Sequence, residues 1–144
     1  MTRINTCIPK ALTDQHLIGE YNEIRRPVQL AINKYNKHAE KGFDIPSTYR
    51  LGPGHVLFFY DKLKYIHKRF NAICDEMKVR GFNVNTGFDE SRIPDRLYND
   101  WEPTKEANDL LVNRLIEKIN SSKITWRYYK QPITKDYFNI LKDE

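Results

Sequence analysis

The 144-residue chain has little cysteine, and no stretch of it is apolar over the length that a membrane span needs. Its two cysteines, Cys7 and Cys74, lie far apart and in no spacing typical of metal ligands. A transmembrane helix needs about 20 predominantly apolar residues, and no run approaches that length. The sequence therefore offers no cysteine metal motif and predicts no membrane span.

Histidine is also sparse, and its four residues are dispersed along the chain. His16 and Glu20 are spaced to share one face of a helix, but two ligands do not make a metal site. We therefore expect no structural or catalytic metal. Repeats, low-complexity segments and linkers are missing too, which predicts a single domain over residues 1–144 with one hydrophobic core.

The composition is that of a folded domain with a basic surface. Hydrophobic residues make up 40% and charged residues 30% of the chain, which argues against extended disorder. Twenty-four Lys and Arg against nineteen Asp and Glu give a net charge of +5. That charge is compatible with a nucleic-acid partner, although many basic proteins bind none. The segment Met1–Asn5 has no apolar stretch behind its basic residue, so we expect no secretory signal and a cytoplasmic location.

Three stretches have the apolar spacing of helices. The first begins after Thr13 or Asp14, either of which could cap it. Pro27 should kink or interrupt this helix, which then resumes toward Tyr35. The second runs from about Asp61 to Arg80.

A third helix is expected to begin after Thr104 as its cap, with acidic residues in its first turn. Long loops join the three helices, and Gly81 is a suitable stop for the second. The apolar run from Val56 to Tyr60 could be a short buried strand or the entry to the second helix. The predicted fold class is all-α, a compact single domain of three main helices with long connecting loops.

Aromatic and basic residues alternate near the C-terminus, in Trp126, Arg127, Tyr128 and Lys130. Aromatic faces can stack on nucleic-acid bases while the cations between them neutralise phosphates. The alternative is a tail that packs its aromatics on the helices and extends its cations into water. The residues alone leave both interpretations open.

Two further features could carry chemistry. Glu23 stands beside Arg25 and Arg26, and it could be a tuned acid or base, although spacing alone favours a solvated surface pair. Thr2 is small, which permits removal of Met1 during synthesis and would free its α-amine. That amine has an ordinary pKa of about 8, so it can attack an aldehyde-like carbon and form a Schiff base. Every protein has an N-terminus, however, so this feature alone does not indicate a function.

These features occur together in a pattern that resembles the phage pyrimidine-dimer DNA glycosylases, also called ultraviolet-damage endonuclease V. The similarity extends to about Ile133, in one order and at nearly constant spacing. The segments that carry it are Met1–Asn5, Asp14–Leu17, Glu20–Tyr21 with Glu23, Leu51–Val56, Phe58–Leu63, Arg80–Asn83, Glu117–Ile119, Thr125–Trp126 and Tyr128–Tyr129.

The resemblance implies a mechanism without metal or cofactor. The α-amine of Thr2 would attack C1′ of the damaged nucleotide, displace the base and leave an imine. A carboxylate at Glu23 would then assist sugar opening and the proton transfer that permits β-elimination. The implied substrate is a cyclobutane pyrimidine dimer in damaged double-stranded DNA, and the implied enzyme is a monomer in the cytoplasm, which for a viral protein is that of the host.

The resemblance also implies a set of DNA contacts. Arg3 and Arg26 match phosphate-binding positions of the family, whereas Asn22 stands where the phage enzymes commonly carry arginine. Arg25 could supply a replacement charge, though on a different helix face. The further expected contacts are His16, Arg114, Lys118, Trp126, Arg127, Tyr128 and Lys130.

Two alternatives stay open. The same chemistry could act on another lesion, such as an oxidised or alkylated base. The chain could also be a basic helical DNA-binding protein without catalysis, but a pure binder needs neither the Met1–Arg3 segment nor a glutamate at position 23.

Overall fold

The computed structural model describes residues 3–38 and 43–143 and confirms the all-α prediction, with one small hairpin as the exception. The long helices are α1 (Asp14–Glu23), α2 (Arg26–Lys37), α4 (Leu63–Val79) and α5 (Lys105–Ser121). The shorter elements are η1 (Pro9–Ala11), α3 (His55–Phe58), η2 (Glu90–Arg92), η3 (Asp95–Leu97), β1 (Arg127–Tyr128), β2 (Gln131–Pro132) and α6 (Tyr137–Lys142). No helix in these two ranges is long and apolar enough to span a membrane.

Helix caps and Pro27 set the bounds of the first helices. The Thr13 hydroxyl accepts a hydrogen bond from the backbone N–H of His16 at 3.0 Å, which confirms Thr13 as the cap. The predicted interruption is also confirmed, because α1 ends at Glu23 and Pro27 lies in the first turn of α2. A missing N–H costs nothing there, since the first turn has no intrahelical acceptor.

The second and third predicted helices are α4 and α5. Thr104 caps α5 by accepting from the N–H of Ala107 at 3.0 Å, and α4 starts two residues later than expected. Gly81 follows α4 with φ +85°, a conformation that only glycine adopts without strain. The run Val56–Tyr60 is not a strand, because α3 occupies residues His55–Phe58.

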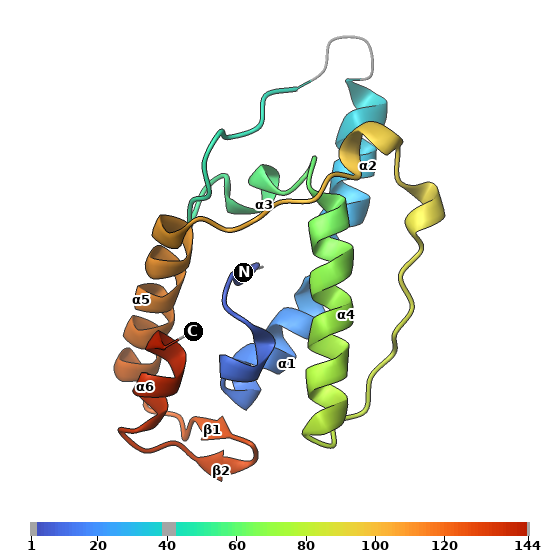
Figure 1. The fold of residues 1–144 in the computed structure, drawn as a ribbon. Coiled ribbons are helices and arrows are strands. Elements are labelled where there is room, and N and C mark those ends of the chain that lie inside the picture. Colours follow the sequence, from blue (N-terminus) through green and yellow to red (C-terminus); the bar gives the residue numbers. More distant parts are fainter. Residues whose placement is uncertain (1–2, 39–42, 144) are drawn as a thin grey trace.

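The N-terminal segment from Arg3 to Ile8 runs between α4 and α5 (Figure 1). It is tied to both helices: Arg69 of α4 donates to the Cys7 carbonyl at 2.7 Å, and Thr6 donates to the Asn108 side chain of α5 at 2.8 Å. α1 packs against α4, and α6 packs against α5. The segment from Arg3 to Ile8 therefore lies inside the helical assembly.

The C-terminal hairpin was not predicted from the sequence. β1 and β2 pair antiparallel around a turn in which Tyr129 and Lys130 have φ of 51° and 68°. The Asp14 carboxylate of α1 accepts from both backbone N–H groups of that turn, at 3.1 and 2.7 Å. Arg80 bonds the same carboxylate at 2.9 Å, so a buried charge network joins the hairpin to the helices.

Candidate active site

A cleft of about 310 Å³ lies between the N-terminal segment and α1, and we call it the α1 cleft. One face of α1 forms most of its wall, since its lining residues recur at three- and four-residue intervals. The residues that line it are Arg3, Asn5, Gln15, His16, Gly19, Glu20, Asn22 and Glu23.

The cleft contains two carboxylates, and Glu20 is committed to structure. Arg69 donates to its two oxygens at 2.6 and 3.0 Å, and the side chains of this pair are only 6% and 1% exposed. Asn5 donates to the same oxygens through its backbone N–H at 3.2 Å and its side-chain amide at 2.7 Å. With four donors around it, Glu20 anchors the N-terminal segment to α1 and α4.

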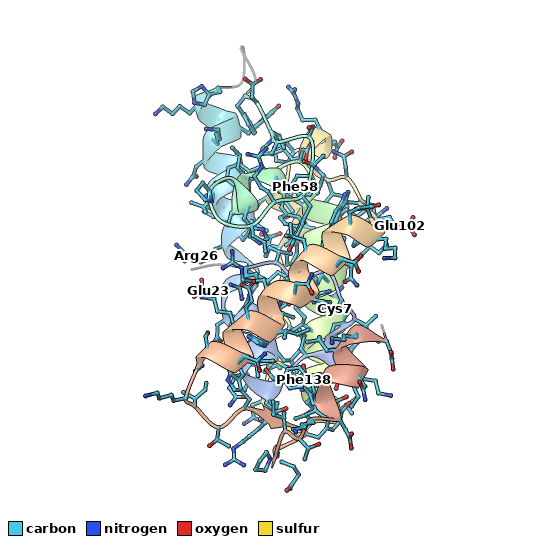
Figure 2. All side chains as sticks on the ribbon, turned by 90° about the vertical axis from the view of Figure 1, so that its left-hand side faces the viewer. Cys7, Glu23, Arg26, Phe58, Glu102 and Phe138 are labelled. Atoms are coloured by element: carbon cyan, nitrogen blue, oxygen red, sulfur yellow. The ribbon has the colours of Figure 1, made fainter. Side chains whose placement is uncertain are left out.

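Glu23 is the accessible carboxylate of the cleft. It is the last residue of α1, and its side chain is 37% exposed. One oxygen lies 3.0 Å from a guanidinium nitrogen of Arg26, whose side chain is 61% exposed. Figure 2 shows both residues at the same edge of the molecule. An exposed ion pair of this kind contributes little to stability.

The charge of Arg3, which lines the cleft, is influenced by a second arginine, Arg114 of α5. Burial lowers the pKa of Arg3, and the positive charge of Arg114 on α5 lowers it further. Arg114 therefore lies close enough to repel Arg3, although 111 positions separate them in the sequence. A bound anion would relieve that repulsion. Lys118 stands one helical turn beyond Arg114 and is exposed, and neither residue lines the cleft.

His16 lines the cleft, and its side chain is partly buried. Burial and the charge of Arg3 lower its pKa to about 4. Its ring packs against Trp126 with centroids 4.5 Å apart. Within the described part of the chain, His16 Nδ1 and Trp126 Nε1 are buried and have no hydrogen-bond partner.

The tail reaches the cleft through Gln15. This side chain donates to the Thr125 carbonyl at 2.7 Å and accepts from the Arg127 N–H at 3.0 Å, which places Trp126 on His16. Tyr128 is engaged with the protein, because its hydroxyl donates to the Lys10 carbonyl at 2.8 Å and its ring lies under Arg80. Tyr128 therefore packs on the protein, as in the second of the two interpretations of the tail given by the sequence.

Beyond Tyr128, the Lys130 ammonium lies 5.1 Å from the Phe82 ring centroid, and Arg127 is exposed and donates to the Lys130 carbonyl at 3.3 Å. Asn22 and Arg25 differ in their relation to the cleft. Asn22 is exposed and lines it. The Arg25 guanidinium lies 4.8 Å from the Phe70 ring centroid and donates to the Gly87 carbonyl at 3.2 Å. Arg25 thus contacts residues outside the α1 cleft.

The site residues expected from the sequence and the residues that line the cleft overlap in part. The cleft brings together Arg3, His16, Asn22 and Glu23, whereas Thr2 lies outside the described residues. Sequence reasoning did not assign four lining residues to the site: Asn5, Gln15, Gly19 and Glu20. The helical spacing from His16 and Glu23 could have indicated three of them, but nothing in the sequence pairs Glu20 with Arg69.

A family model described as pyrimidine dimer DNA glycosylase matches residues 1–90 of the chain. The matched region is more than half of the 144 residues and includes every lining residue of the α1 cleft. It ends before α5 and the C-terminal hairpin, so the contributions of Arg114 and Trp126 lie outside it.

Proposed function

The chain belongs to the pyrimidine dimer DNA glycosylase family, and we propose that its α1 cleft both excises the damaged base and cleaves the strand. The substrate in this proposal is a cyclobutane pyrimidine dimer in duplex DNA. The protein acts as a monomeric DNA glycosylase and abasic-site lyase that draws its nucleophile from its own backbone.

The reaction proceeds in two stages. The α-amine of Thr2, freed by removal of Met1, attacks C1′, and the bond from C1′ to the base breaks. The sugar ring then opens to leave an imine between Thr2 and C1′. The imine acidifies the C2′ proton, Glu23 accepts that proton, and the electron pair expels the 3′ phosphate as the C3′–O bond breaks.

The observation that carries this proposal is that Arg3 and Glu23 line one cleft. Thr2 is bonded directly to Arg3, and one residue of chain spans at most about 3.6 Å. The residue bonded to the proposed nucleophile therefore lines the same cavity as an accessible carboxylate. Because Glu20 is already bonded to Arg69 and Asn5, Glu23 is the group suited to proton transfer.

The charges around the cleft support a DNA duplex as the partner. The positive charge of Arg114 lowers the pKa of Arg3, and Arg26 forms an exposed pair with Glu23. Each cation that neutralises a phosphate releases counterions and so strengthens binding. We assign these three residues to phosphates, with Lys118 and Arg127 as outer contacts.

The remaining expected contacts differ in position. His16 and Asn22 line the cleft and are suited to contact the damaged nucleotide, and Trp126 packs behind His16. Tyr128 is bonded to the protein and supports the hairpin.

Borohydride trapping tests the lyase chemistry. The protein is mixed with ultraviolet-irradiated duplex or with an abasic-site duplex, in EDTA, and borohydride reduces any imine to a stable covalent complex. We expect a trapped complex on both duplexes. No complex on either would contradict the proposal, and a complex on abasic DNA alone would assign the chemistry to another lesion.

Substitution of Glu23 tests the proton transfer. Glu23→Gln keeps the shape of the side chain but removes the base, so strand cleavage should fall by at least about 10²-fold while DNA binding persists. Glu106→Gln, an exposed change in the first turn of α5, is the matched control and should leave cleavage unchanged. Full cleavage by Glu23→Gln would remove Glu23 from the mechanism.

A further inference from the structure

The backbone of Ile4 is held by a histidine outside the cleft. The Ile4 N–H donates to His55 Nε2 at 2.7 Å, and His55 Nδ1 lies 2.7 Å from the Arg50 carbonyl. A carbonyl only accepts, so Nδ1 carries the proton and Nε2 is the bare acceptor that Ile4 requires. The two contacts together fix one neutral tautomer of His55.

The surroundings of His55 maintain that state. The residue is 3% exposed, begins α3 directly after Gly54, and packs edge-on against Tyr49 and Phe59. Burial lowers the pKa of His55, and so does the charge of Arg3, whereas the bond to Arg50 and the charge of Glu20 act in the opposite direction.

Side chains also hold the rest of this backbone. The Tyr49 hydroxyl donates to the Ile4 carbonyl at 3.1 Å, and the Tyr65 hydroxyl donates to the Asn5 carbonyl at 3.2 Å. Glu20 accepts from the Asn5 N–H. All four polar backbone groups of two consecutive residues thus bond to buried side chains.

This arrangement has no counterpart in ordinary secondary structure, where backbone groups bond to each other. Chain termini are usually poorly ordered unless they are tied down, and here the ties come from α1, α3, α4 and the loop before α3. They converge two residues away from Thr2. The segment they hold, at Arg3 and Asn5, lines the α1 cleft on both sides of Ile4.

We propose that His55 is a positioning residue, which holds Ile4 so that the Thr2 amine is presented to C1′ in the α1 cleft. The effect of His55 on catalysis rests on the proposed function. His55 touches no reacting atom and acts through the backbone of the N-terminal segment. Because reactions of this kind are sensitive to misplacement, loss of the tie should slow imine formation more than it weakens DNA binding.

Two substitutions of His55 separate the hydrogen bond from the bulk of the ring. His55→Phe keeps an aromatic ring but removes the acceptor. His55→Gln can place an amide oxygen near the former Nε2 position and should retain it. His67→Phe is the matched control, since His67 contacts Phe88 and Tyr98 and lies outside the cleft.

Three quantities are measured on the full-length protein: the single-turnover rate of borohydride trapping on an abasic duplex, the Kd for a duplex with an uncleavable abasic analogue, and amide hydrogen exchange at Ile4. For His55→Phe we expect trapping to slow at least about 10-fold, Kd to stay within about threefold, and Ile4 exchange to accelerate. His55→Gln should restore both rates toward those of the unmodified protein.

Tyr49→Phe provides a milder second test if His55→Phe does not fold. It removes only the hydroxyl that donates to Ile4 and should also slow trapping at unchanged Kd, whereas its control Tyr60→Phe should not. Trapping at the full rate in both His55→Phe and Tyr49→Phe, or equal losses in the Phe and Gln variants of His55, would overturn the proposal. Absence of trapping by the unmodified protein would refute the proposed function, while unaltered Ile4 exchange in His55→Phe would refute the anchoring itself.

Discussion

The Glu20–Arg69 pair should be the costliest polar contact of the cleft to break. Its side chains are 1% and 6% exposed, and Arg69→Met would leave the Glu20 carboxylate buried with only the Asn5 donors. Removal of one partner of a buried pair costs about 3–5 kcal/mol. A domain of this size has a free energy of unfolding of about 5–15 kcal/mol, so the melting temperature should fall by roughly 6–20 °C.

Urea denaturation followed by circular dichroism measures this cost, with Glu20→Gln and the double variant completing a cycle. The double variant should lose clearly less than the sum of the single variants, because neither buried charge remains unpaired. Lys68→Met is the matched control: Lys68 is the neighbour of Arg69, its pair with Asp100 is exposed, and its removal should cost less than about 1 kcal/mol. A loss for Arg69→Met as small as that of Lys68→Met, or strictly additive losses in the cycle, would refute the assignment of Glu20 to structure.

Two more predictions concern charged or titratable groups in and near the cleft. The imidazole of His16 should titrate with a midpoint near 4 when followed by NMR. This pKa lies below the unfolded value of about 6.5, so the unfolded state binds the proton first as the pH falls. The free energy of unfolding should therefore decrease as the pH drops from about 6.5 toward 4. A midpoint near 6.5 would contradict the lowered pKa of His16. Arg114→Gln should reduce the slope of log K against log salt concentration for duplex binding by about 1. Lys105→Gln, at the far end of α5, is the control and should not change that slope. Equal slopes in both variants would remove Arg114 from the phosphate contacts.

Local signals in the sequence predicted the helical framework well. Thr13 and Thr104 cap their helices as expected, and Pro27 separates α1 from α2, because capping and backbone restriction act over a few residues. The hairpin at Arg127–Pro132 had no such signal. It depends on Asp14 and Arg80, which approach it only in the folded chain.

In the cleft, too, local features could be predicted from the sequence and long-range contacts could not. Glu23 and His16 share a helix face that the spacing indicates, and the family resemblance gave them roles. The partners of the N-terminal segment could not be predicted, since Arg69 lies 49 residues from Glu20 and His55 lies 51 residues from Ile4. No periodic pattern in the sequence indicates either contact. Both become visible only when α3 and α4 pack around the N-terminal segment.

The central claim is that the nucleophile is the α-amine of Thr2. The borohydride-reduced complex with an abasic duplex can be digested with nuclease and protease, and the modified peptide located by mass spectrometry. The account predicts a sugar adduct on the α-nitrogen of Thr2, in a peptide that has lost Met1. An adduct on a lysine side chain, or a complex formed equally well by protein that retains residues ahead of Thr2, would contradict it.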